Sequence, residues 1–142
     1  MSKCDPSHFS AKLIIPGHFL TEIILHCQEQ SPYEACGILA GKNNVVEKVF
    51  KMTNVEKSSV SYLMDSREQF IAMKEMSGLG LAMVAIYHSH PVSSAYPSPK
   101  DISLAFYPDT FHVIVSLASG AAVIKAFEIK DGVREIEIIE TH

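Results

Sequence analysis

Two histidines, His88 and His90, stand two residues apart at the end of an apolar run. If that run is a β-strand, side chains at i and i+2 point to the same face, so both imidazoles converge on one point. Imidazole is the commonest metal ligand in proteins, and three protein ligands plus a water define a catalytic zinc site. The pair therefore predicts two ligands of a metal centre, although strands that bind nothing also contain this spacing.

A carboxylate further along the chain completes such a set. Asp101 follows a loop rich in serine and proline, and a loop of that length lets it fold back over the end of the strand. Zinc held by His88, His90 and Asp101 would keep one open position, where it would lower the pKa of a water to about 7. That chemistry also needs a proton acceptor that is not a ligand, and Glu34 is the candidate.

Each of these residues also has a purely structural interpretation. Ser98 and Asp101 have the spacing of a capping box, which stabilises the start of a helix without any metal. Glu34, taken alone, is typical of a solvated carboxylate in a loop. Cys27 and Cys36 have apolar neighbours, which predicts core positions and not nucleophiles.

The pattern of apolar residues predicts an α/β fold, with a mixed sheet of about six to eight strands and two or three helices. Helical spacing begins at His18 and stops near Ser31, and a third, short helix is expected to start at Ser98. Strands are expected over residues 11–15, 36–41, 45–52, 60–64, 81–87, 111–117, 121–129 and 133–139. The glycines of the 36–41 strand indicate places where neighbouring backbones approach closely.

The second helix is expected to begin at Ser66, which has capping-box spacing with Gln69. Phe70, Ile71 and Met76 are expected to form its buried side. Two glycines near residue 80 should end it.

Length and composition bound the function classes. The 142 residues suit one domain, residues 1–142, in which residues 1–10 are expected to be a flexible tail. A net charge of −4 without a basic stripe argues against nucleic acid as partner. The apolar run 79–87 is far shorter than the ~20 residues that a membrane helix needs. Three cysteines without CxxC spacing and a start without an apolar segment favour the cytoplasm.

The polar residues, taken together, resemble a known family. The segment His88–Asp101 reads H-x-H-x7-S-x2-D, which is similar to the signature of the JAMM/MPN+ zinc metalloproteases. The segment Glu34–Gly41 resembles that family's E-x-x-G-x-L-x-G. The resemblance implies a curved sheet with flanking helices, similar to cytidine deaminases, and one zinc per chain held by His88, His90 and Asp101. It also implies that Glu34 is the general base and that Ser98 helps to stabilise the tetrahedral oxyanion.

The resemblance also implies a substrate. The chain looks like the compact prokaryotic form of the family, whose members are associated with ubiquitin-like sulfur carriers that end in Gly-Gly. We therefore expect an isopeptidase or peptidase that hydrolyses the bond after the carrier's C-terminal glycine, with residues 60–64 and 92–97 as walls of the groove. Two alternatives are a non-catalytic MPN-type scaffold and a DNA-repair-associated domain. The chain has all five residues of the family's site, whereas inactive relatives typically lose the ligands or the glutamate, which argues against the scaffold. It has no evident helix-hairpin-helix region, which argues against the DNA-repair domain.

Overall fold

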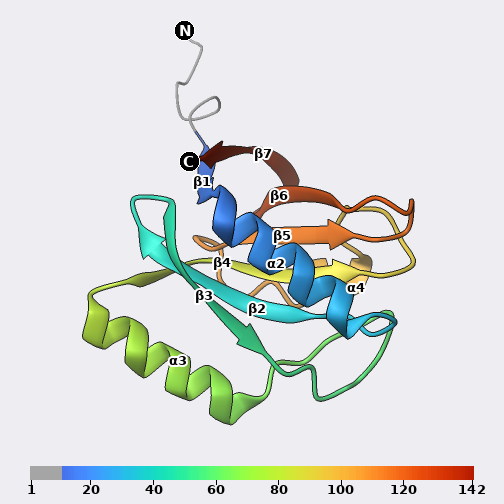
Figure 1. Cartoon of the computed structure of the whole chain (residues 1–142), viewed down its shortest axis with the longest axis horizontal. Helices are drawn as coiled ribbons and strands as arrows, with labels where there is room; N and C mark the ends of the chain where they lie inside the picture. Colours follow the sequence, from blue (N-terminus) through green and yellow to red (C-terminus); the bar gives the residue numbers. More distant parts are fainter. Residues whose placement is uncertain (1–10) are drawn as a thin grey trace, which may run out of the picture.

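Seven strands close into a barrel in the computed structural model, which describes residues 11–142 and places three helices around the sheet (Figure 1). The expected flexible tail, residues 1–10, lies outside the described residues. The strands are β1 (Lys12–Pro16), β2 (Cys36–Lys42), β3 (Val45–Met52), β4 (Ala82–His90), β5 (Phe111–Ser116), β6 (Val123–Ile129) and β7 (Val133–Thr141). The helices are α2 (Gly17–Gln30), α3 (Ser66–Leu79) and α4 (Pro99–Ser103).

The strand order is β1-β3-β2-β4-β5-β6-β7, and β7 pairs with β1 to close the sheet. The pairs β1–β3, β1–β7 and β4–β5 are parallel, and the remaining pairs are antiparallel. The expected curved, mixed α/β sheet is confirmed. In addition, its curvature is strong enough to close the sheet on itself, which removes unpaired edges.

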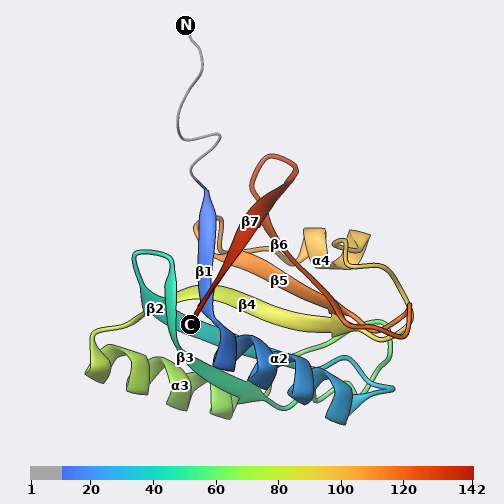
Figure 2. The same ribbon diagram turned by 45° about the horizontal axis from the view of Figure 1, so that its top comes forward.

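The central strand β4 is covered on both faces. Tyr87 belongs to the core cluster that includes Ile23 and Cys27 of α2, whereas Ile86 belongs to the cluster that includes Ala72 and Met76 of α3. Because side chains alternate along a strand, His88 and His90 share the face of Ile86. In Figure 2, α4 lies beyond β5 and β6, toward the same end of the sheet as the arrowhead of β4, where the histidines are. Cys27 and Cys36 are both buried, as expected.

Two glycines of β2 let the neighbouring strands pack closely. A Cβ atom on Gly37 would overlap the ring of Tyr87, which lies opposite it on β4. That ring is fully buried, and its hydroxyl shares a hydrogen bond of 2.6 Å with Nδ1 of His26 on α2. A Cβ atom on Gly41 would overlap the backbone carbonyl of Val45. The expectation of close approach at the glycines is confirmed.

The helix α3 begins at Ser66, as expected, but its N-cap is a different residue from the one that the sequence predicts. The N-cap is Asp65, whose Oδ1 accepts hydrogen bonds of 3.0 Å from the amides of Arg67 and Glu68. The prediction of Ser66 as the cap was therefore wrong, because a carboxylate one position earlier already reaches both free amides. The helix ends at Gly80, which adopts φ 70°.

Two further expectations were wrong. Residues 60–64 form no strand. Met64 alone among them forms a β-bridge, an isolated one with Asn54. Phe70 and Ile71 are 64% and 56% exposed, because α3 packs through Ala72 and Met76, four residues apart. At about 100° per residue, positions 70 and 71 lie on other sides of the helix.

No helix within residues 11–142 combines the length and the apolar character needed to cross a membrane.

Replacing Gly37 by alanine should lower the free energy of unfolding by about 1–3 kcal/mol, the usual cost of overpacking a filled core. The added methyl group and the Tyr87 ring cannot both keep their positions. Urea denaturation measures the change. As a control, Gly78→Ala adds a methyl group to open space in α3 and should stabilise by about 0.5–1 kcal/mol. Equal behaviour of the two variants would contradict the packing argument.

Candidate metal centre

The carboxyl end of β4 brings two imidazoles together. His88 and His90 are both buried, and their Nε2 atoms lie 3.2 Å apart. β4 is held here by β2 on one side and by β5 on the other, with Cys36 opposite His88 and Ser116 opposite His90. The paired neighbours fix the backbone of both histidines, so the spacing of two residues does place both rings on one point, as expected.

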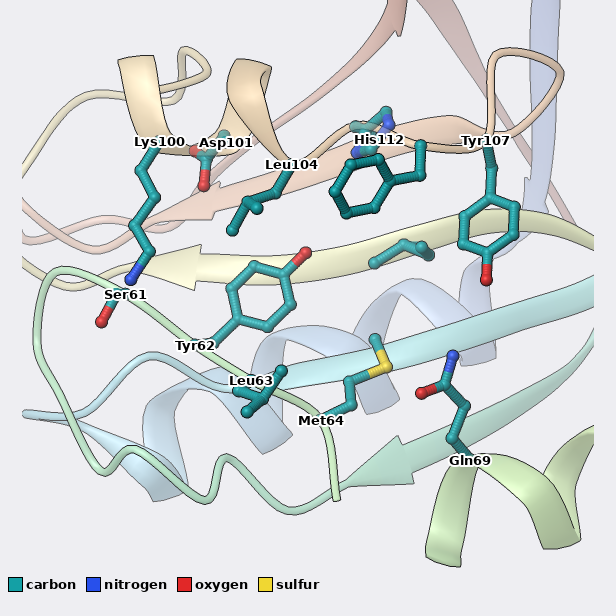
Figure 3. A pocket seen from close by; sticks show the side chains of 12 residues that line it. Ser61, Tyr62, Leu63, Met64, Gln69, Lys100, Asp101, Leu104, Tyr107 and His112 are labelled. Carbon is teal, nitrogen blue, oxygen red and sulfur yellow. The ribbon is translucent and has the colours of Figure 1, made fainter. Parts of the chain in front are cut away.

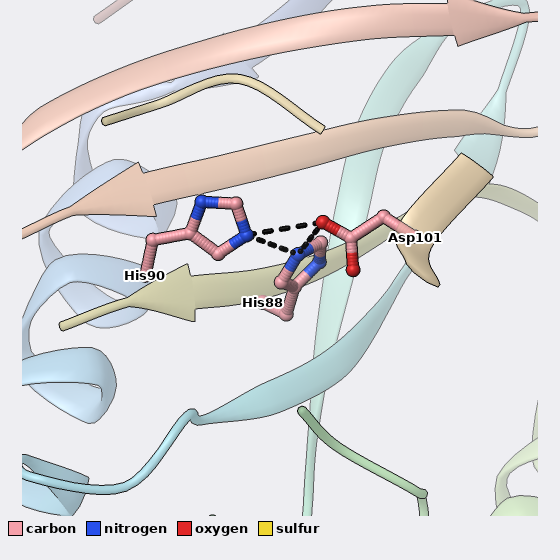
Figure 4. A group of neighbouring side chains, drawn as sticks. All are labelled: His88, His90 and Asp101. Carbon is pink, nitrogen blue, oxygen red and sulfur yellow. Dashed lines mark hydrogen bonds and ion pairs between the residues drawn. The ribbon is translucent and has the colours of Figure 1, made fainter. Parts of the chain in front are cut away.

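The third group comes from α4 (Figure 4). Oδ2 of Asp101 lies 3.1 Å from Nε2 of His88 and 3.0 Å from Nε2 of His90. The same oxygen accepts a hydrogen bond of 2.9 Å from the amide of Ser98, and Oγ of Ser98 accepts one of 3.0 Å from the amide of Asp101. This is the capping box that the sequence offered as a structural alternative. The cap is compatible with a role as metal ligand, because it aims the carboxylate at the imidazoles.

The donor set fits a metal ion. The three atoms lie 3.0–3.2 Å from one another, and ligands of a tetrahedral zinc at about 2.0–2.1 Å would lie roughly 3.3–3.4 Å apart. Nδ1 of His90 lies 2.8 Å from the carbonyl of Ser94. A carbonyl only accepts, so Nδ1 carries a proton, and in the neutral imidazole Nε2 then has a free lone pair for a metal. Two imidazoles and one carboxylate suit zinc and leave a fourth position open.

The electrostatics of the set favour a bound cation. Burial alone would raise the pKa of Asp101, but hydrogen bonds from His88 and His90 outweigh it and hold this pKa well below its usual range. Burial lowers the pKa of His88. For His90, burial is outweighed by the hydrogen bond to Asp101, which raises its pKa. An ionised carboxylate beside a buried neutral imidazole is the protonation state that metal ligands need.

Glu34 lies at the same edge of the sheet. The amide of Ser89 donates to the carbonyl of Ala35 at 3.0 Å, and the amide of Ala35 donates to Oγ of Ser89 at 2.7 Å. Continuing this antiparallel pairing by one step puts Glu34 next to His90. Glu34 is only 3% exposed, and its Oε1 has no hydrogen-bond partner within residues 11–142. The interpretation as a solvated loop carboxylate was therefore wrong.

The protonation of Glu34 is balanced near neutral pH. Burial raises its pKa to about 7, with His90 lowering it and Asp101 raising it. A carboxylate with such a pKa can both take up and release a proton at neutral pH. The arrangement can therefore polarise a bond and move a proton within one small space.

A cavity of about 290 Å³ opens beside Asp101. Figure 3 shows Tyr62 and Met64 on one side of it and Lys100, Leu104 and Tyr107 on the other. Its complete lining is Ser61, Tyr62, Leu63, Met64, Gln69, Ile86, Lys100, Asp101, Leu104, Phe106, Tyr107 and His112. Of the two walls expected for a substrate groove, 60–64 contributes to this cavity. Residues 92–96 line a different hollow, together with part of β6.

Two aromatic residues lie beside the centre at positions that no motif spacing predicts. The ring of Tyr62 stacks on His88 at 4.7 Å between centroids, with 28° between the planes. His112 is buried in the cavity wall, and burial lowers its pKa to about 4. It stays outside the three-ligand cluster. No spacing rule finds Tyr62, because a loop brings it to His88 from a distant part of the chain.

Comparison with known proteins decides the family. A model described as prokaryotic homologs of the JAB domain matches residues 16–130. The chain belongs to this family. The prokaryotic JAB protein is 36% identical over 123 residues to a CysO-cysteine peptidase of Mycobacterium tuberculosis, covering 84% of each chain. It is 31% identical over 137 residues to a probable TtuB-protein conjugate cleaving protease of Thermus thermophilus, covering 96% of this chain and 88% of the relative.

Solved structures agree with this assignment. Protein DSY2949 of Desulfitobacterium hafniense superposes with a TM-score of 0.83 at 38% identity, covering 92% of this chain and 93% of that one. A JAMM protein described as having a metalloprotease-like zinc site matches with a TM-score of 0.58 at 21% identity, covering 92% and 100%, and shows the shared fold. With the named relatives, the family assignment makes this JAB protein a hydrolase of peptide or isopeptide bonds.

Ser98→Ala should lower the free energy of unfolding by about 1 kcal/mol, because the amide of Asp101 loses the Oγ acceptor of its cap. The matched control is Ser103→Ala in the same helix, where the hydroxyl donates to the carbonyl of Lys100 in an exposed position. Surface changes of this kind stay within about 0.5 kcal/mol. Thermal unfolding of both variants measures the difference, and equal losses would show that the cap of Ser98 adds nothing to stability.

Proposed function

We propose that the protein is a zinc-dependent isopeptidase or peptidase that hydrolyses the bond after the C-terminal glycine of a ubiquitin-like sulfur-carrier protein. The observation that carries the proposal is the convergence of His88, His90 and Asp101 within 3.2 Å, next to the buried, unpartnered carboxylate of Glu34. The names of the relatives, a CysO-cysteine peptidase and a TtuB-conjugate protease, support this substrate class.

In this proposal His88, His90 and Asp101 hold the metal. A zinc ion bound there would supply Lewis acidity toward a carbonyl oxygen and would lower the pKa of a water to about 7. Glu34 takes the proton of the attacking water on its free Oε1 and delivers it to the leaving amine, for which a pKa of about 7 suits both transfers. Oγ of Ser98 accepts from the Asp101 amide, so its own proton remains available to the developing oxyanion.

Access to the centre favours a tail of glycines. The ligand side chains are only 1% to 9% exposed, so a chain that reaches them must be slender. Glycine has no side chain to collide with these walls. The tail upstream of the glycines then lies in the cavity between residues 61–64 and 100–107, where apolar side chains line the wall.

A non-catalytic scaffold explains the site less well. Burying a carboxylate without a hydrogen-bond partner costs free energy, and a structural role would provide partners. Glu34 is buried with its Oε1 unpartnered among the residues described, which is typical of a group kept for proton transfer.

Protein purified without added metal should contain about one zinc per chain, as three ligands with an open position predict. Asp101→Ala should lose most of it, because two buried imidazoles remain as the ligand set. The control Asp109→Ala removes an exposed carboxylate outside the cluster and should keep full zinc. Elemental analysis of the three proteins measures the contents. Full occupancy in Asp101→Ala would take Asp101 off the list of ligands.

The zinc-loaded protein should release cysteine from the C-terminal glycine of a carrier–cysteine adduct, and lysine conjugates of the carrier should also be cleaved. Glu34→Gln should keep zinc and fold but lose roughly 10²-fold or more in kcat, because an amide cannot accept the proton. The control Glu29→Gln changes an exposed residue of α2 and should retain full activity.

Three outcomes decide the substrate. Cleavage that disappears when the penultimate glycine becomes leucine supports a narrow glycine channel. Equal cleavage of an unrelated peptide of the same length indicates a general peptidase and contradicts the carrier assignment. Absence of cleavage by zinc-loaded protein contradicts the enzyme mechanism proposed here.

A further inference from the structure

The loop that follows β3 is organised around one buried amide. Asn54 is 6% exposed, and its side chain makes all four hydrogen bonds that an amide can make with two donors and two lone pairs. Nδ2 donates to the carbonyls of Glu34 (3.0 Å) and Ser61 (3.1 Å), and Oδ1 accepts from the amides of Glu56 (3.0 Å) and Leu63 (3.1 Å). Two carbonyls and two amides as partners leave one orientation of the side chain.

One of these bonds holds the main chain of Glu34. The carbonyl of Glu34 accepts from Asn54, and its amide donates to the carbonyl of Ser58 at 2.8 Å. Both polar groups of the Glu34 backbone are therefore bound by the loop 54–64. The next residue, Ala35, is bound on the other side by Ser89. Glu34 is thus clamped between this loop and β4, while its side chain keeps a free oxygen.

The same loop also reaches the metal centre and the cavity. Tyr62 stacks on the ring of His88, and residues 61–64 form one wall of the cavity beside Asp101. The bonds from Asn54 to Ser61 and Leu63 flank Tyr62 on both sides. A single buried side chain consequently ties the position of Glu34 to that of the cavity wall.

We infer that Asn54 is a positioning residue for the reaction, which sets the main chain of Glu34 and the Tyr62 wall relative to the metal ligands. It has no contact with the ligand atoms, so it acts through Glu34 and through the loop. The inference rests on the proposed function, because it takes Glu34 to be the base. Misplacement of a catalytic group by about 1 Å costs up to roughly 10²-fold in rate, so a residue that fixes Glu34 should show itself in kcat.

Asn54→Asp is the sharpest test. The change keeps an oxygen for the amides of Glu56 and Leu63 but places a second oxygen against the carbonyls of Glu34 and Ser61. With a carrier–cysteine adduct and zinc-loaded protein, well below the unfolding temperature, kcat should fall roughly 10-fold or more. Zinc content should stay at the wild-type level. Hydrogen exchange should speed up in peptides that cover residues 33–37, a change that looser packing elsewhere would not produce.

The matched control is Thr53→Val at the neighbouring position. It removes the hydrogen bond of 2.8 Å from Oγ1 to Glu68, which lies outside the loop 54–64, and should leave kcat and the exchange of residues 33–37 unchanged. If the aspartate variant does not fold, Asn54→Ala replaces it, because this change removes the hydrogen bonds without adding a charge. The same fall in kcat and the same faster exchange of residues 33–37 are expected. Failure of both variants to fold would overturn the inference in favour of a residue needed only for stability.

The remaining outcomes separate this inference from the proposed function. The inference is overturned if folded Asn54→Asp keeps the wild-type kcat, or if Thr53→Val loses as much kcat as Asn54→Asp. The proposed function survives either result, provided that the wild-type protein cleaves the adduct and Glu34→Gln does not. Inactive wild-type protein overturns the proposed function, and the inference with it.

Discussion

The geometry of this site depends on a single carboxylate oxygen. Oδ2 of Asp101 accepts from the Ser98 amide in the capping box of α4 and faces the Nε2 atoms of both histidines of β4. The start of the helix and the candidate metal centre therefore share one carboxylate oxygen. A helix of only five residues is too short to be stable alone, so its cap and its contact with β4 must hold it in place. Conversely, the imidazoles obtain their third partner because that helix starts where it does.

The second constraint is the close packing of β2 on β4. Gly37 leaves room for the Tyr87 ring on one face of the sheet, and the same pairing brings Ala35 to Ser89. Because side chains alternate, Tyr87 and Ser89 take the structural bonds on one face while His88 and His90 occupy the other. One strand thus makes its structural bonds through its odd-numbered positions and presents the candidate ligands from its even-numbered ones. This separation allows the face with the histidines to change without loss of the core.

The sequence predicts best those features that depend on neighbours along the chain. The alternation and the apolar runs found the strands of the barrel, and the spacing of His88, His90 and Asp101 identified the groups that the structure brings together. Features that depend on distant contacts were missed. The segment 60–64 reads as a strand by composition, but the side chain of Asn54 binds it as a loop. Likewise, the buried side of α3 follows from where the helix touches β3 and β4, and not from its apolar residues alone.

The two carboxylates of the centre show how one site assigns different tasks to the same chemical group. Asp101 accepts hydrogen bonds from two imidazoles and a backbone amide, and its pKa is held low, so it stays charged and suits a ligand. Glu34 is buried with a free Oε1, and burial raises its pKa to about 7, so it suits proton transfer. Where two titratable groups in one site have their pKa values pushed apart, the environment itself assigns their roles. In the proposed mechanism, the number of hydrogen-bond donors around each carboxylate, which a helix cap supplies to Asp101 and which Oε1 of Glu34 lacks within residues 11–142, is what distinguishes ligand from base.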